Sequence, residues 1–329
     1  MERGGVSGTE AGAEALSETP VFGTTVVNRP ARAARRTLKA IVFNARSGAR
    51  FEGILACLRR PPLAGADVIM LCEADWQLRR SFDREIAADL AAELDMSFAY
   101  GPEFAIRRPP GGAPSFLGNA ILTSAPLADA RMIALPTTRM SRRYAHLIGQ
   151  PHALIATAKF GGRQVTIAVA HLHSRWNPAG RARQMAQLLE YLAPLDAVAG
   201  GDAANAQGAV ILGGDFNTTT TDLYAPWGMA MVAVQMATRP WRFRYPEPYE
   251  PLFAELARGG FKVRGANVPG KPTFTFSRAI PPALRPKLDW IALRGLEPMP
   301  GSARVVAARE SFFGPRVSDH DFVMCEVRL

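Results

Sequence analysis

Several short apolar runs in this chain of 329 residues stop abruptly at one polar or charged residue. The runs that show this pattern most plainly end at Asn44, Glu73, His171 and Asp215. Burying a carboxylate or an imidazole at the end of a strand is costly unless a metal ion or a hydrogen bond compensates for the lost water. We therefore expect these strand ends to converge on one polar site, which restricts the folds that the chain can adopt.

The spacing of apolar residues predicts strands that alternate with helices. Strands are expected at 38–43, 67–72, 119–122, 153–160, 164–170, 210–212, 287–293, 303–308 and 322–329, helices at 51–58, 81–94, 178–195 and 251–258, and a loop at 101–118. The hairpin about Gly161-Gly162 and the clustered C-terminal strands do not suit a purely parallel sheet. They favour an α/β fold in which a two-layered mixed β-sheet sandwich is flanked by helices.

The two ends of the chain differ in character. Residues 1–36 are rich in Gly, Ala, Thr and Arg without periodicity, which predicts a flexible N-terminal tail. Residues 37–329 contain no internal repeat or linker, so we expect a single domain there. No apolar run is long enough for a transmembrane segment and no secretory signal is visible, so the sequence predicts a cytoplasmic location.

Charge and cysteine content narrow the function only slightly. The net charge is +10, from 39 Lys and Arg against 29 Asp and Glu, and residues 258–294 hold eight basic residues but one acid. Such a field attracts phosphate esters and nucleic acids, although a bias toward Arg codons explains it equally well. Cys57, Cys72 and Cys325 are widely spaced and match no disulfide or zinc pattern, so we expect buried thiols.

The polar strand ends occur within motifs that resemble the endonuclease/exonuclease/phosphatase superfamily, which has the DNase I-like fold. The motifs, in chain order, are Phe43-Asn44, Leu71-Cys72-Glu73, Gly118-Asn119-Ala120-Ile121-Leu122, Ala170-His171-Leu172, Gly214-Asp215-Phe216-Asn217, Leu288-Asp289-Trp290-Ile291 and Ser318-Asp319-His320. Each motif is weak or moderate evidence by itself, but the ordered set is strong. The resemblance implies that residues 37–329 form a catalytic domain that hydrolyses phosphate esters with Mg²⁺, or with Mn²⁺ in its place.

The resemblance also implies a role for each polar residue. Glu73 would be the chief metal ligand, completed by Asn44 and Asp319, and Mg²⁺ suits such oxygen donors. Asp215 would orient and deprotonate the attacking water, and Asn217 would donate a hydrogen bond to the phosphoryl group. His320, held by Asp289, would be a second charge stabiliser or a proton donor. His171 would contact the scissile phosphate.

Three further residues are candidates for substrate binding: His173, Asn119 and Arg46. His173 lies two residues beyond His171 and competes with it for the same position in the family pattern. Arg46 stands where some DNA-repair members carry an acid, so an abasic-site endonuclease and a second metal subsite are disfavoured. An Arg at this position can pair with a substrate phosphate. Arg139, Arg142 and Arg143 are equal candidates for a further phosphate contact.

The fold alone does not identify the substrate. A nuclease or other phosphodiesterase is the favoured hypothesis, with nucleic acid as the expected partner; a phosphatase or a phospholipid-cleaving enzyme is the alternative. No amphipathic membrane hairpin stands out, which disfavours the lipid substrate. The segment Trp241-Arg242-Phe243-Arg244-Tyr245 either stacks bases or is an ordinary amphipathic surface. A non-enzymatic binding module would be expected to have lost some of the polar set.

Overall fold

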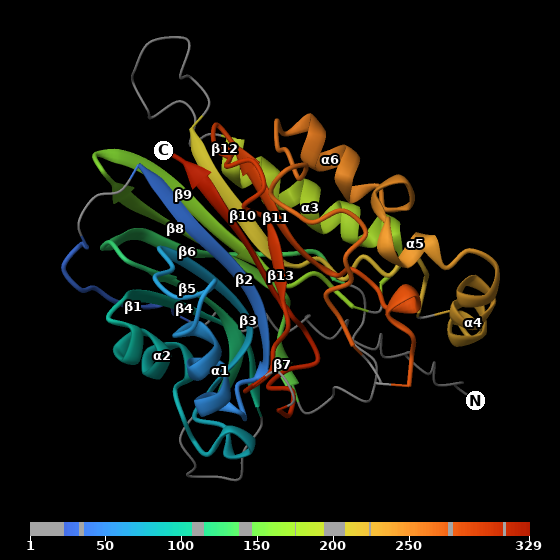
Figure 1. The fold of residues 1–329 in the computed structure, drawn as a ribbon, viewed down its shortest axis with the longest axis horizontal. Coiled ribbons are helices and arrows are strands. Elements are labelled where there is room, and N and C mark those ends of the chain that lie inside the picture. The colour runs from blue at the N-terminus through green and yellow to red at the C-terminus, as the bar shows by residue number, and fades with distance from the viewer. Residues whose placement is uncertain are drawn as a thin grey trace, which may run out of the picture.

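The structure is a computed structural model, and it describes residues 23–32, 36–106, 115–137, 147–174, 176–193, 208–223, 225–275, 279–311 and 314–329. Two β-sheets pack face to face in these residues, and helices cover the two outer faces (Figure 1). The predicted α/β sandwich of mixed sheets flanked by helices is therefore confirmed. None of the described helices combines the length and the apolar character needed to cross a membrane.

The larger sheet has nine strands and contains the N-terminal half of the chain together with its C-terminus. Its order is β1-β4-β5-β3-β2-β14-β12, with β7 paired to β4 and β13 paired to β14. All its pairs are antiparallel except β2 with β3. The strands are β1 (Thr25–Val27), β2 (Thr37–Ser47), β3 (Val68–Trp76), β4 (Ser97–Ile106), β5 (Phe116–Thr123), β7 (Leu147–Gly149), β12 (Glu297–Pro298), β13 (Arg304–Val306) and β14 (Phe322–Arg328).

The smaller sheet has five strands in the order β11-β10-β9-β8-β6, of which only β9 and β10 are parallel. Its strands are β6 (Leu127–Ala134), β8 (His152–Phe160), β9 (Arg163–Ala170), β10 (Ala209–Asp215) and β11 (Asp289–Arg294). The helices are α1 (Phe51–Leu58), α2 (Ile86–Leu94), α3 (Pro178–Leu192), α4 (Gly228–Thr238), α5 (Trp241–Arg244) and α6 (Leu252–Arg258).

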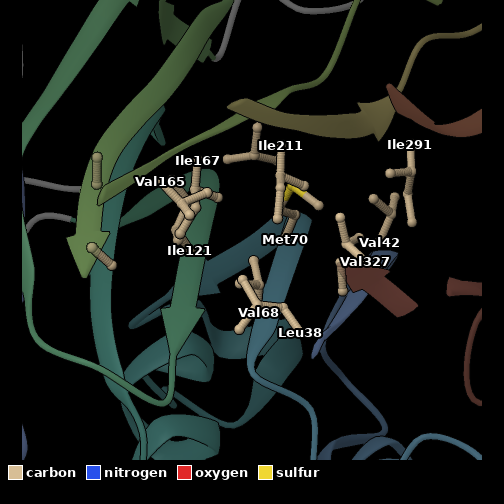
Figure 2. Packing of buried hydrophobic residues seen from close by; sticks show 14 of the residues in the cluster. Leu38, Val42, Val68, Met70, Ile121, Val165, Ile167, Ile211, Ile291 and Val327 are labelled. Atoms are coloured by element: carbon tan, nitrogen blue, oxygen red, sulfur yellow. The ribbon is translucent and has the colours of Figure 1, made fainter. Parts of the chain in front are cut away.

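Alternation along the strands separates three apolar cores. On β2, Leu38, Ala40 and Val42 face the other sheet, whereas Ile41 and Phe43 face α1 and α2. Figure 2 shows the inter-sheet layer, where side chains of β2 and β3 meet those of β9, β10 and β11. The third core lies between the smaller sheet and the helices α3 and α6. Because both faces of each sheet are covered, the central strands are almost continuously apolar, as the sequence shows.

Three local predictions differ from the structure. Residues 25–27, within the expected flexible tail, form β1 and pair with 98–100 of β4. The side chains of β1 are exposed, so apolar periodicity gave no sign of this strand. The expected loop 101–118 instead contains the end of β4 and the start of β5, because Gly101 and Pro102 are accommodated within a paired strand. The helix expected from residue 81 begins at Ile86, since Phe82 adopts a left-handed backbone conformation and is exposed.

Gly213 and Gly214 of β10 allow the chain to approach its neighbours closely. A Cβ on Gly213 would lie 2.4 Å from Val42 Cγ2 and 2.8 Å from Met70 Cε, in the inter-sheet core. Gly214 has φ +143°, and a Cβ there would lie 2.0 Å from the carbonyl oxygen of Ala170 on β9. The two glycines therefore place the following residue, Asp215, beside the end of β9.

We expect Gly213→Ala to lower the free energy of unfolding by about 1–3 kcal/mol, because the added methyl group overpacks the inter-sheet core. Urea denaturation of the purified variant measures the change. Gly23→Ala is the matched control, since nothing lies within 4 Å of its Cβ position. Equal stability of the two variants would contradict the packing described for β10.

Candidate active site

Asp215 is the meeting point of polar side chains from distant parts of the chain. Its Oδ2 accepts a hydrogen bond from Asn44 Nδ2 at 3.1 Å. The same oxygen lies 3.7 Å from His171 Nε2 and 3.6 Å from His320 Nε2. Asn44 belongs to β2, His171 follows β9 and His320 precedes β14, so both sheets contribute to the site. The expected convergence of strand ends is present around this carboxylate.

Glu73 lies in an irregular part of β3 that aims its side chain at Asn44. The pairing of β3 with β5 shifts register between Leu71 and Ala74, and Glu73 has a left-handed backbone with φ +53°. Bulges of this kind commonly redirect a side chain beside a functional site. Glu73 Oε1 accepts a hydrogen bond from Asn44 Nδ2 at 3.0 Å and lies 3.9 Å from His171 Nε2. Asn44 therefore connects the carboxylates of Glu73 and Asp215 through its NH₂ group.

His320 and Asp289 form a buried pair at the edge of β11. Asp289 Oδ2 lies 2.8 Å from His320 Nδ1, and both side chains are almost fully buried. The backbone N–H of Asp289 donates to Thr273 Oγ1, and the backbone N–H of His320 donates to Ser318 Oγ. Ser318 Oγ donates in turn to the carbonyl of Asn44, so the Ser-Asp-His motif is tied to β2.

Asp319 is half-buried and lines the same cavity as Glu73. A cavity of about 640 Å³ is lined by both acids and by four arginines: Arg46, Arg50, Arg80 and Arg316. Arg46 Nε lies 3.3 Å from Asp319 Oδ2, and its side chain is 66% exposed. The guanidinium group of Arg46 can therefore move from Asp319 to another anion at modest cost, as expected for an exposed ion pair.

Glu103 is a site residue that the sequence pattern did not reveal. It is buried on β4, and its Oε1 accepts a hydrogen bond from the backbone N–H of His152 at 3.1 Å. Burial raises the pKa of Glu103 to about 7, while the neighbouring His171 acts in the opposite direction. In the sequence, Glu103 is an acid that follows the apolar residues from Phe98. Because Gly101-Pro102 comes directly before it, this part of the chain resembles a loop.

The remaining predicted residues differ in how they contact the site around Asp215. Asn217 N–H donates to Asp215 Oδ1, and Asn217 Nδ2 donates to the carbonyl of Leu172, next to His171. Asn119 is buried on β5 and donates to the carbonyl of His152, so it contacts the site through Glu103. The ring of His173 lies against the edge of the Trp176 ring, with the ring centroids 6.3 Å apart. Arg139, Arg142 and Arg143 lie outside the described residues.

A buried ion pair supports the loops that carry Asn217 and His171. Arg181 of α3 and Glu250 are both fully buried and form a two-point contact, and Glu250 also accepts from the backbone N–H of Thr220. Gln184, one helical turn later, accepts from the backbone N–H of His173. Removing one partner of such a pair would leave an uncompensated charge in the interior.

Neighbouring charges favour the charged forms of His171, His320 and Glu73. Burial opposes a charge on His171, but Asp215, Glu73 and Glu103 outweigh it and raise the pKa of His171. Burial likewise opposes a charge on His320, whose pKa is raised by Asp289 and Asp215. For Glu73, burial is outweighed by His171 and by the Asn44 hydrogen bond, so the pKa of this carboxyl is lowered. The neighbouring acids therefore stabilise the charged forms of both histidines, and His171 and His320 in turn stabilise the charged form of Glu73.

Two sets of donor atoms suit a divalent cation. The carboxylates of Glu73 and Asp319 line the same cavity, where there is room for the water molecules that Mg²⁺ retains. The amide oxygen of Asn44 accepts from the N–H of Arg46, so a contact with a cation requires the amide to rotate. Asp215, Asp289 and His320 form a second set, with one donor atom from each lying within 4.8 Å of the others.

Comparison with known proteins identifies the family to which this fold and this arrangement of acids and histidines belong. A sequence model of the Endonuclease/Exonuclease/phosphatase family matches residues 41–320. The chain therefore belongs to that family. A search of curated proteins found no match.

Several solved structures share the fold at low sequence identity. A family member from Beutenbergia cavernae is 17% identical, with a TM-score of 0.55 over 90% of this chain and 72% of its own. The human Nocturnin catalytic domain with bound sulfate is 20% identical, with a TM-score of 0.52 over 94% and 98%. D. rerio TDP2 complexed with single-strand DNA product is 17% identical, with a TM-score of 0.52 over 90% and 100%. Likeness at this level shows a common fold.

The raised pKa of Glu103 predicts a pH dependence of stability. Because the folded protein binds this proton more tightly than the unfolded chain, the contribution of Glu103 to stability is fully present below about pH 4.5 and is lost as the pH rises toward 7. Glu103→Gln mimics the protonated group and keeps an acceptor for the N–H of His152. We expect the variant to exceed the wild type by less than about 1 kcal/mol at pH 5 and by up to about 3 kcal/mol at pH 8.

Urea denaturation in the presence of EDTA at both pH values measures this difference. Glu52→Gln is the control, because the side chain of Glu52 is 78% exposed. A constant difference between wild type and Glu103→Gln across the pH range would contradict the burial of an ionisable carboxyl at this position.

Proposed function

We propose that this protein is a metal-dependent hydrolase of phosphodiesters, with nucleic acid as the favoured substrate class. The observation that carries the proposal is the convergence of Asn44, His171 and His320 on one oxygen of Asp215. A carboxylate between a metal-ligand candidate and two histidines is suited to orient a water molecule against a bound phosphoryl group. Family membership supports hydrolysis of a phosphoric ester.

A divalent cation held by Glu73 and Asp319 would polarise a phosphoryl oxygen and neutralise its charge. Mg²⁺ is the proposed ion, with Mn²⁺ as a substitute, because the donors are carboxylate oxygens at a hydrated cavity. Asn44 would orient Glu73 through the hydrogen bond that the two share. Arg46 would leave Asp319 and pair with an oxygen of the substrate.

Asp215 would accept a proton from the attacking water, while Asn217 would bind a phosphoryl oxygen after its amide leaves the carbonyl of Leu172. His320 would donate a proton or a hydrogen bond to the leaving oxygen, since its pKa is raised and Asp289 fixes its ring. His171 would stabilise the developing charge from the opposite side. His173 and Asn119 would act further out, in substrate binding and in support of the site.

The basic surroundings favour a polyanionic diester over a small monoester. Arg46 and Arg50 line the cavity next to Glu73 with more than half of each side chain exposed. Each is paired with a carboxylate of the protein, so both can exchange that partner for a neighbouring phosphate. The D. rerio TDP2 structure is a complex with a single-strand DNA product, which supports the same substrate class. A phosphatase or phospholipid-cleaving activity is the second candidate.

A substrate panel separates these candidates. The protein is incubated with Mg²⁺ or Mn²⁺ and with single-stranded DNA, RNA, bis-p-nitrophenyl phosphate, p-nitrophenyl phosphorylcholine or p-nitrophenyl phosphate. We expect turnover of the nucleic acids and of bis-p-nitrophenyl phosphate, with little turnover of the monoester. Preference for the monoester would favour a phosphatase, preference for the choline diester would favour a phospholipid substrate, and no turnover of any compound would refute the proposal.

Asp215→Asn and His320→Gln each remove an ionisable group while keeping the size of the side chain. We expect each to lower kcat for the best diester by at least ~10²-fold, the usual contribution of a general acid–base group. Asp83→Asn is the control, because Asp83 is exposed. Circular dichroism checks that the fold is retained. Wild-type rates in both site variants would exclude the roles assigned to them.

Glu73→Gln tests the metal site. The substitution keeps an oxygen acceptor for Asn44 but removes the charge, so we expect the Mg²⁺ concentration that gives half-maximal activity to rise at least about tenfold. Titration of activity against Mg²⁺ measures the effect, with Glu52→Gln as the control. An unchanged titration curve would show that the cation binds elsewhere, with the Asp215, Asp289 and His320 set as the next site to test.

A further inference from the structure

The segment from Trp227 to Tyr245, which contains α4 and α5, exposes apolar side chains at high density. Ten large apolar side chains are exposed among the described residues, and six of them lie in this segment: Trp227, Met229, Met231, Val234, Trp241 and Tyr245. The exposed fraction reaches 65% for Trp227 and 73% for Met229. Single exposed apolar residues are normal, but a cluster of this size marks an interaction surface.

The distribution of residues on α4 is the reverse of that on an ordinary surface helix. Its only buried side chain is polar: Gln235 Nε2 donates to Thr220 Oγ1 at 2.5 Å, and Gln235 Oε1 accepts from Thr221 Oγ1 at 3.1 Å. The helix carries no charged residue, and its Met, Val and Ala side chains are exposed except for Val232 and Met236, which are half-buried. It belongs to none of the three apolar cores and lies at the margin of the molecule (Figure 1).

The geometry of α4 favours a lipid environment over a groove on another protein. Successive residues of a helix are rotated by about 100°, so Met229 points away from Met231 and Val234, which lie about 60° apart. A groove on another protein covers one stripe of a helix, whereas the fluid boundary of a bilayer takes up exposed apolar side chains that point in more than one direction. With 11 residues, α4 is about 16 Å long, too short to span a hydrocarbon core of about 30 Å.

The flanks of α4 match the chemistry of an anionic bilayer surface. Trp227 precedes the helix and Trp241 follows it, and indole rings favour the boundary between headgroups and acyl chains. No acid occurs between Asp222 and Glu247, whereas the segment holds Arg239, Arg242 and Arg244. Basic residues next to an inserted apolar segment are attracted to anionic headgroups.

The same segment does not suit base stacking, the other use considered for its aromatic and basic residues. Phe243 is buried, and its carbonyl accepts from the backbone N–H of Lys287. Arg242 lies over the ring of Tyr249 at 4.2 Å, and Arg244 Nε donates to the carbonyl of Gly270. These contacts hold α5 against the domain, and the aliphatic side chains of α4 offer nothing for a base to stack on.

We propose that the α4–α5 segment docks the protein on an anionic lipid bilayer, with α4 lying in the interfacial plane. Gln235 of α4 forms a hydrogen bond with Thr220, and Thr220 lies three residues after Asn217 in the chain. Docking therefore brings the rim of the polar site close to the headgroup layer. The inference stands on an exposed surface and does not depend on the reaction that the site performs. It assigns the protein a location for its activity, at a membrane surface.

Co-sedimentation of the full-length protein with lipid vesicles tests the proposal. Vesicles of phosphatidylcholine, with and without phosphatidylserine, are used in EDTA so that hydrolysis plays no part. We expect binding that requires phosphatidylserine and weakens with added salt. The triple variant Met229→Gln, Met231→Gln, Val234→Thr should reduce binding at least about tenfold, since it removes most of the inserted apolar area.

The variant residues are exposed, so the stability of the triple variant and its turnover of a soluble diester should match the wild type. Tyr191→Gln, which changes an exposed aromatic on α3, is the control and should bind vesicles normally. Absence of wild-type binding, or equal binding of the triple variant, would overturn the proposal. Two other results would also overturn the proposal, provided that the triple variant binds vesicles as the wild type does. One is that the variant is a monomer where the wild type is a dimer, and the other is that the variant loses affinity for single-stranded DNA.

Discussion

The close approach of β10 to its neighbours determines where Asp215 lies, and the rest of the polar site is arranged around Asp215. Gly213 leaves space for Val42 and Met70 from the opposite sheet, and Gly214 passes within contact of β9. Any side chain at these two positions would separate the strands whose ends meet at the site. The buried carboxylate of Asp215 is thus placed by packing in the inter-sheet core.

The polar groups around Asp215 are stable because they compensate for one another. Each buried acid has a histidine, an amide or a backbone N–H within reach, and each histidine faces at least one acid. The left-handed conformations of Glu73 and Asn217 add local strain of the order of 1 kcal/mol each, which the surrounding sheets tolerate. A site that combines strain with preorganised charge is suited to reaction chemistry more than to stability.

The polar site and the apolar α4–α5 segment are connected through one short loop. This loop begins at Asn217, reaches Gln235 through Thr220 and Thr221, and is held from beneath by the ion pair between Arg181 and Glu250. A surface that binds at α4 therefore acts on the same segment that would contact the phosphoryl group. The proposed docking and the proposed reaction are distinct properties, but the fold places them within a few residues of each other.

The sequence by itself determined the fold class and most of the strands, because central strands covered on both faces must be continuously apolar. It also determined which residues end those strands, and hence Asn44, Glu73, His171 and Asp215 as site candidates. Only the tertiary structure brought Glu103 to His171 and showed that Asn44 offers its NH₂ group to two acids, because these contacts join strands that are distant in sequence. The sequence also did not show that α4 is exposed. An apolar segment has the same composition whether it lies in a core or on the surface, and only the packing of the folded chain decides which.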